Sequence, residues 1–272
     1  MEECMIADRL KNILLQELAT NNRAGLYAAT QKMMAYNSNR IEGSTLTSEQ
    51  TASLFDTGTI ISNGVEVYKA KDIEEMTGHF RMFNQMLKYI DEPLSIDLIK
   101  SYHYQLKNGV FEDMANGYPI GEFKNRQNGV SDLKTSSPAE VSEQIESLLK
   151  EYESSTHGLK DIAKFHAKYE KIHPFQDGNG RTGRMIMIKQ CLDSHIVPVI
   201  IRDEDKLLYY KALHLAQTEE QYDPLRDFFA ECQKKYLEEI GEYLLDPVRE
   251  FSTKDIDRVK RENRYLADDI DG

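Results

Sequence analysis

The sequence is poor in cysteine and has no long apolar run. Its 272 residues include only three cysteines, Cys4, Cys191 and Cys232. An odd number of widely scattered cysteines fits neither a disulfide framework nor a zinc site, so we expect reduced thiols in a cytoplasmic protein. No apolar stretch approaches the ~18 residues that a membrane helix requires. Residues 1–4 are acidic where a secretion signal would be basic, so secretion is not indicated.

The chain also lacks an excess of basic charge. It holds 46 Asp and Glu against 34 Lys and Arg, which gives a formal net charge of −12. A negative field disfavours sequence-independent binding to nucleic acid or anionic lipid, so we expect neither as a partner. Hydrophobic residues make up 40% of the chain, an ordinary share for a globular protein. No internal repeat and no long linker divides it.

Apolar residues recur at helical spacing along most of the chain, which predicts an all-α fold. Thr47 with Gln50 forms a capping box, the mark of a helix start, and residues 137–140 open another helix with a cap and a first-turn proline. The predicted helices cover residues 2–20, 25–37, 47–54, 66–90, 96–106, 160–172, 183–194, 204–217 and 224–245.

Residues 121–135 are the exception to the helical pattern. Asn128-Gly129 favours a tight turn, because both residues tolerate positive φ. We therefore expect a small β-hairpin in this segment.

One segment carries the chemistry: residues 173–184, His-Pro-Phe-Gln-Asp-Gly-Asn-Gly-Arg-Thr-Gly-Arg. Gly178 and Gly180 allow successive backbone N–H groups to converge on an anion. The electropositive N-terminus of the following helix points to the same place. Arg181 and Arg184 are three residues apart, hence on one helical face, and guanidinium groups bind phosphate oxygens in pairs.

Two further side chains of this segment suit a phosphate substrate. Asp177 offers a hard oxygen ligand for Mg²⁺. His173, just before the turn, can accept a hydroxyl proton. The residues alone thus predict a site for a magnesium polyphosphate with a base beside it.

The same glycines also match a dinucleotide-binding pattern. Gly178, Gly180 and Gly183 fit G-x-G-x-x-G, and Asp203 follows about twenty residues later. However, residues 172–177 contain His, Pro, Gln and Asp, where a buried parallel strand would be apolar. This context disfavours the dinucleotide interpretation.

Residues 173–184 resemble the signature of the Fic family, H-P-F-x-D-G-N-G-R-x-x-R, with every defining position filled. The resemblance extends from about Ser95 to Gln217. It implies a Fic-type helical core over residues 93–218, which includes a β-hairpin flap at residues 121–135. Residues 1–92 would then form an N-terminal helical region, and residues 219–272 C-terminal helices with a charged tail.

The resemblance also implies a protein adenylyltransferase. Such an enzyme transfers AMP from Mg²⁺–ATP to a Tyr, Thr or Ser hydroxyl of a target protein, itself included, and releases pyrophosphate. His173 would be the general base, and Asp177 would hold Mg²⁺. Arg181 would contact the β-phosphate region and Arg184 the γ-phosphate.

Further nucleotide contacts follow from the same resemblance. The anion hole would consist of Gly178, Asn179 and Gly180. The flap that clamps the nucleotide and aligns the target by strand addition would include Val130, Ser131, Asp132 and Leu133. The base pocket would be lined by Tyr209, Tyr210 and Gln217. For the two tyrosines, a purely core role stays open.

Residues 38–43, Ser-Asn-Arg-Ile-Glu-Gly, resemble the family's inhibitory motif, [S/T]-x-x-x-E-[G/N]. Glu42 would pair with Arg184 and so withdraw the cation that holds the γ-phosphate. Ser38, one helical turn earlier, would bond near the anion hole or cap the helix. In some relatives this glutamate also helps water to remove AMP, so removal stays open here. An ordinary helix-terminal acid is the alternative.

Two other functions stay open at this point. A Fic-fold enzyme can transfer UMP or phosphate instead, although the glycine at position 180 favours nucleotidyl transfer. A nucleotide-sensing interaction module without turnover is the other alternative, and it would not need His173 and Asp177. The apolar N-terminal helix is compatible with a homodimer.

Overall fold

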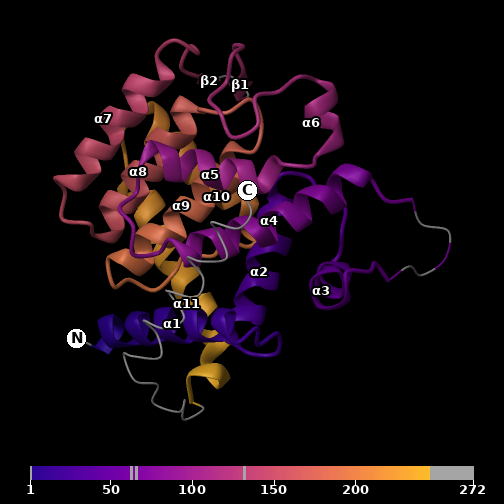
Figure 1. Cartoon of the computed structure of the whole chain (residues 1–272). Helices are drawn as coiled ribbons and strands as arrows, with labels where there is room; N and C mark the ends of the chain where they lie inside the picture. Colours follow the sequence, from indigo (N-terminus) through magenta and orange to yellow (C-terminus); the bar gives the residue numbers. More distant parts are fainter. Residues whose placement is uncertain (1, 62–63, 65–66, 131–132, 246–272) are drawn as a thin grey trace.

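A computed structural model of the chain describes residues 2–61, 64, 67–130 and 133–245 (Figure 1). Helices dominate it, as the periodicity predicted. They are α1 (Glu2–Ala19), α2 (Leu26–Ile41), α3 (Ser48–Thr57), α4 (Ala70–Lys88), α5 (Ile96–Lys107), α6 (Phe111–Ala115), α7 (Val141–Glu153), α8 (Leu159–Ile172), α9 (Asn179–Asp193), the 3₁₀ turn η1 (Asp203–Asp205), α10 (Lys206–Thr218) and α11 (Asp223–Leu245). None of these helices is long and apolar enough to cross a membrane.

The helix α9 runs through the middle of the bundle and is buried along nearly its whole length (Figure 1). It packs against α2, α4, α5 and α8. The sequence predicted its start near residue 183, but it begins at Asn179. The reason is Gly178, whose left-handed φ of 82° lets the chain turn directly from the loop into the helix. The loop that carries the motif is therefore fixed to a core element.

The helix α2 continues to Ile41, beyond its predicted end at Asn37. Polar residues in its last turn are buried and find tertiary partners. The side-chain oxygen of Asn37 accepts a hydrogen bond from the backbone of Asp203 at 3.0 Å, and the side-chain oxygen of Asn39 accepts one from Arg181 Nη1 at 3.3 Å. Ser38 thus lies inside the helix rather than capping it.

The hairpin exists, but its turn is not where the sequence placed it. Strands β1 (Gly129–Val130) and β2 (Leu133–Lys134) pair antiparallel, with Gly129 opposite Lys134. Asn128 and Gly129 have negative φ, so they do not form the turn. Residues 131–132 connect the strands and lie outside the described residues. Asn128 instead anchors the hairpin through its side chain, as described below.

The structure also differs from the sequence-based expectation at two helices. The helix after the hairpin begins at Val141, and the carboxylate of Glu140 instead accepts bonds from the backbone and hydroxyl of Ser137. The short helix α6 was not predicted. The charged tail lies outside the described residues. The three-part division at residues 92 and 218 stays a prediction. Across the first of these boundaries, α2 and α4 pack against α9.

The helices α4 and α5 lie in close contact at Gly78. A Cβ atom at this position would lie 1.9 Å from the Leu106 carbonyl oxygen. This approach positions Glu75 of α4 and Lys107 of α5 beside the motif loop.

Replacing Gly78 with Ala should therefore lower the free energy of unfolding by about 1–3 kcal/mol, because the added methyl group forces two backbones apart. Urea-induced unfolding measures this loss. Gly241→Ala in α11 is the matched control, since its Cβ would meet no described atom within 4 Å. The control should be neutral or gain up to about 1 kcal/mol. Equal stability of Gly78→Ala and the native chain would contradict the close packing.

Candidate active site

His173 ends α8 in a left-handed backbone conformation, with φ 53°. Its Nδ1 lies 3.3 Å from the Glu170 carbonyl oxygen. Since a carbonyl only accepts, Nδ1 carries the proton and Nε2 is the basic nitrogen. Burial lowers the pKa of His173 to about 4, assisted by the charge of Lys124 and opposed by the bond to Glu170. The imidazole is therefore neutral near pH 7 and able to accept a proton.

The loop after His173 is pinned by Phe175. This ring is fully buried and stacks on the ring of His103, with 3.9 Å between centroids. The Asn179 side chain closes the loop: Oδ1 accepts from the Phe175 N–H at 2.7 Å, and Nδ2 donates to the Phe175 carbonyl at 2.8 Å. The Asn179 side chain is thus fixed within the loop. The backbone N–H of Asn179 is one of the N–H groups in the first turn of α9 that have no partner within the helix.

The hairpin is attached to this loop by Lys124 and Asn128. Lys124 Nζ donates to Asn128 Oδ1 at 2.6 Å, to Thr135 Oγ1 at 3.2 Å and to the Ile172 carbonyl at 3.3 Å. Asn128 Nδ2 donates to the Phe175 carbonyl at 2.7 Å. Burial lowers the pKa of Lys124 to about 8. One lysine and one amide therefore hold the predicted flap against the predicted catalytic loop.

Arg184 is brought together with the two residues of the predicted inhibitory motif. Its Nη2 lies 2.7 Å from Glu42 Oε1 and 3.0 Å from the Ser38 carbonyl, and Nε donates to Ser38 Oγ at 2.9 Å. Partial burial would raise the pKa of Glu42, but the charges of Arg184 and Arg181 outweigh it and hold the pKa below its usual value. The predicted contact is present and ionic.

The Glu42 carboxylate also covers the start of α9. A Cβ at Gly180 would lie 2.3 Å from Glu42 Oε1. A carboxylate thus lies at a helix N-terminus, where the partial positive charge favours an anion. The carboxylate can approach this closely because glycine has no Cβ atom.

Glu170 is a second carboxyl group beside Arg184, and the sequence gave no sign of it. It is buried, and its Oε1 has no hydrogen-bond partner among the described residues. Burial raises its pKa to about 8, opposed by the charge of Arg184 and reinforced by that of Glu42. Glu170 is therefore largely protonated at neutral pH.

Asp177 lies within a buried network of charges. Its Oδ2 is 2.8 Å from Lys107 Nζ, and its Oδ1 accepts the Gly178 N–H at 2.7 Å. Burial raises the pKa of Asp177, but Arg181 and Lys107 outweigh it and hold the pKa far below its usual value. Arg181 itself is buried and pairs with Glu75, at 2.5 Å from Nη1 and 3.0 Å from Nη2. Its assignment to the β-phosphate stays a prediction.

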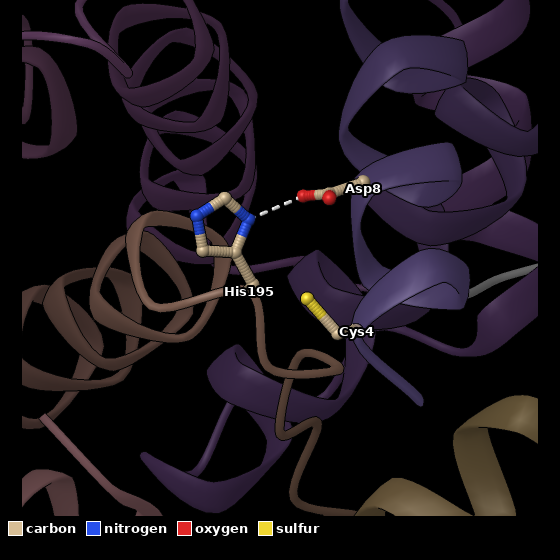
Figure 2. A group of neighbouring side chains, drawn as sticks. All are labelled: Cys4, Asp8 and His195. Atoms are coloured by element: carbon tan, nitrogen blue, oxygen red, sulfur yellow. Dashed lines mark hydrogen bonds and ion pairs between the residues drawn. The ribbon is translucent and has the colours of Figure 1, made fainter. Parts of the chain in front are cut away.

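Among the described residues, two groups of side chains have the composition and spacing that could hold a metal ion. Cys4, Asp8 and His195 form the first, on the surface where α1 meets the end of α9 (Figure 2). His195 Nδ1 lies 2.5 Å from Asp8 Oδ1, and both side chains are exposed. The second group joins Asp177 to two buried acids, Glu75 and Asp113.

The carboxylate oxygens of Asp177 are ligands of the kind that Mg²⁺ prefers, although Lys107 and Lys71 lie against one of them. The Asp177 side chain is 34% exposed, so it can reach an ion that arrives with a ligand from solvent.

The residues assigned to the nucleotide base are in mixed environments. Tyr209 is buried, and its hydroxyl bonds to His166 Nε2 at 2.8 Å, whereas Tyr210 is 40% exposed. Gln217 is buried and donates to the Ala167 carbonyl at 3.4 Å. Val130 and Leu133 pair through their backbones in the hairpin. Ser131 and Asp132 lie outside the described residues.

Several residues of the site were not predicted: Asn39, Glu75, Lys107, Asp113, Lys124 and Glu170. Except for Glu170, which is three residues before His173, they lie on elements distant in sequence, and the packing of α2, α4 and α5 against α9 brings most of them to the loop. One local signal existed. Lys107 follows Leu106 on the apolar face of α5, where a lysine is out of place unless it has partners.

Replacing Asn128 with Ala should detach the hairpin, because it removes the amide bond to Phe175 and one partner each of Lys124 and Thr135. We expect a loss of about 1–3 kcal/mol in stability and faster amide hydrogen exchange at residues 124–130 than in α9. Arg126→Ala is the control, since Arg126 donates to the carbonyls of Asn116 and Gly117 and lies over the Tyr118 ring, away from this anchor. Unchanged exchange in the Asn128 variant would exclude this anchor.

Comparison with known proteins gives consistent matches. Residues 93–191 match the Fic/DOC family. Protein adenylyltransferase Fic of Nematostella vectensis is 28% identical over 209 residues, covering 75% of this chain and 47% of that protein. Protein adenylyltransferase Fic of Drosophila willistoni is 32% identical over 207 residues, covering 75% of this chain and 40% of that protein. The chain thus spans less than half the length of these relatives.

The fold has counterparts among solved structures. A Fic domain containing signaling protein from Bacteroides thetaiotaomicron superposes with a TM-score of 0.69 at 23% identity, covering 92% of this chain and all of the other. At this identity, the likeness supports the fold alone.

Proposed function

Since residues 93–191 form a Fic/DOC family domain, we propose that the chain is a protein adenylyltransferase that transfers AMP from ATP to a hydroxyl side chain of a protein. One observation carries the proposal. A neutral imidazole, with Nε2 as its basic nitrogen, stands directly before a loop whose glycines and helix N-terminus bind anions. The curated relatives bear the name of this activity.

The reaction uses these groups as follows. His173 Nε2 accepts the proton of the target hydroxyl, whose oxygen attacks the α-phosphorus of ATP. The bond between the α-phosphorus and the bridging oxygen breaks, and pyrophosphate leaves with the electron pair. The N–H groups of Asn179 and Gly180 would stabilise the phosphate charge. The Gly178 N–H, predicted to join them, donates to Asp177 Oδ1 in this structure.

Asp177 would hold Mg²⁺ at the phosphates. The ion, when bound, neutralises phosphate charge and orients the leaving group. Tyr209, Tyr210 and Gln217 would lie at the base, and the hairpin residues Val130 to Leu133 beside the target segment.

The pairing of Glu42 with Arg184 supports autoinhibition. It occupies the guanidinium that would bind the γ-phosphate, and the Glu42 carboxylate competes for the N-terminus of α9. ATP would then bind in a pose unfit for transfer. Removal of AMP through Glu42 stays a prediction.

The proposal extends to a cytoplasmic enzyme with ATP and a protein as substrates. The three cysteines are free, with Cys4 exposed and the other two buried, which agrees with a reducing compartment. A homodimer stays a prediction.

His173→Ala should abolish transfer of label from α-labelled ATP, while ATP still binds. Loss of a general base costs about 10²–10⁴-fold in rate. Because protonation inactivates the base, the native rate should be flat in pH near neutrality and fall only as pH approaches the pKa of about 4. His214→Ala, an exposed histidine on α10, is the control. Retained transfer in the His173 variant, or transfer of label from the γ position, would refute the mechanism.

Glu42→Gly should raise self-labelling by at least about tenfold, since a charge-assisted bond contributes ~1.5–3 kcal/mol and 1.4 kcal/mol equals a factor of ten. Ser38→Ala, which removes one contact that holds Arg184 but leaves its pair with Glu42, should not raise it. Glu49→Gln on the exposed start of α3 is the control. Flat activity in a folded Glu42 variant would show that the pair has no inhibitory role.

A further inference from the structure

The ammonium group of Lys107 lies between three carboxylates. Its Nζ is 2.5 Å from Glu75 Oε1, 2.5 Å from Asp113 Oδ2 and 2.8 Å from Asp177 Oδ2. The side chain is buried, at 1% exposure. Nζ donates hydrogen bonds to Glu75 and Asp177, whereas its contact with Asp113 is an ion pair only. Both carboxylate oxygens of Asp113 lack a hydrogen-bond partner among the described residues. Lys107 is thus an internal cation that faces three acids.

Without this cation, the three acids would form a metal site. Their ligand oxygens lie within 4.8 Å of one another, and carboxylates at such spacing bind divalent cations. Glu75 and Asp113 are buried and cannot be screened by water, so their mutual repulsion requires a positive charge nearby. Lys71, at 3.5 Å from Asp177 and 3.9 Å from Asp113, is more exposed and contributes from the rim.

Lys107 also limits what Asp177 offers to a metal. One carboxylate oxygen faces Lys107 and Lys71, and the other accepts the Gly178 N–H with Arg181 at 3.6 Å. A metal ion bound to the remaining lone pairs of the Asp177 carboxylate would need most of its ligands from other groups. Mg²⁺ commonly binds in this way, through one or two carboxylates together with phosphate oxygens and waters.

We propose that Lys107 is a positioning residue, a fixed internal cation that keeps Glu75, Asp113 and Asp177 from capturing a divalent ion and so makes metal binding at Asp177 depend on the nucleotide. This inference rests on the proposed function for the role of Asp177. It adds that the free protein excludes the metal and that the phosphates bring it. Charge at position 107, rather than side-chain shape, is the property that matters.

The test measures metal binding without nucleotide, so it does not depend on catalysis. Mn²⁺ replaces Mg²⁺ as the probe, and free Mn²⁺ is followed by electron paramagnetic resonance. Native protein should bind Mn²⁺ at this site only weakly. Lys107→Met and Lys107→Gln, both neutral, should bind it at least tenfold more tightly. Lys107→Arg, which keeps the charge, should behave as the native protein.

Two further variants assign any gain to these acids. Adding Asp113→Asn to Lys107→Met should return binding to the native level. Lys71→Met should change it less than Lys107→Met, because Lys71 lies farther from the carboxylates. A merely structural lysine would lower stability without creating a metal site.

If the neutral variants unfold in metal-free buffer, Mn²⁺ should restore their folding, followed by circular dichroism. The inference is overturned if folded neutral variants bind Mn²⁺ no better than native protein, or if Mn²⁺ fails to restore the folding of unfolded ones. It is also overturned if native protein binds Mn²⁺ at this site as tightly without nucleotide as with it. Failure of AMP transfer with these binding results intact would instead refute the proposed function alone.

Discussion

The buried guanidinium of Arg181 depends on the carboxylate of Glu75. A charge removed from water costs several kcal/mol unless it is paired and hydrogen-bonded, and Glu75 provides both contacts from the opposite helix. The same carboxylate faces Lys107, which in turn holds Asp177. Alternating charges therefore run from α4 through α5 to the motif loop. Loss of Glu75 would leave Arg181 without its main partner and Lys107 with one carboxylate fewer, so it would disturb both the packing of α9 and the position of Asp177.

The two arginines of α9 are balanced by helices that precede the family domain, but in different ways. Arg181 faces Glu75 in the middle of α4, where the acid is 9% exposed and fixed by a second cation. Arg184 faces Glu42 at the end of α2, where the acid is 33% exposed. Gly43 follows with a φ of 93°, so the chain leaves the helix there. The first pair is suited to hold the fold, and the second can open without unfolding a helix.

The sequence predicted what is local and missed what packing creates. Helical periodicity located most helices, and the motif located the loop, because both depend on residues close in sequence. The end of α2 was missed since Asn37 and Asn39 look like helix breakers until their tertiary partners, Asp203 and Arg181, are known. The hairpin turn was misplaced because Asn128 uses its amide to bind the Phe175 carbonyl, which holds it out of the turn. Lys107 and Glu75 meet only through the contact between α4 and α5.

The contacts of Arg184 would let the same residue serve both of the proposed states, the inhibited one and the active one. Glu42 contributes one bond to it, and Ser38 contributes two, through its hydroxyl and its carbonyl oxygen. If a phosphate displaces the Glu42 carboxylate, the Ser38 contacts still hold the guanidinium in place. The exchange then replaces one anion by another at the same cation and the same helix N-terminus. Such an exchange needs no rearrangement of α9, so its equilibrium is set by the relative affinity of two anions for a site that is already built.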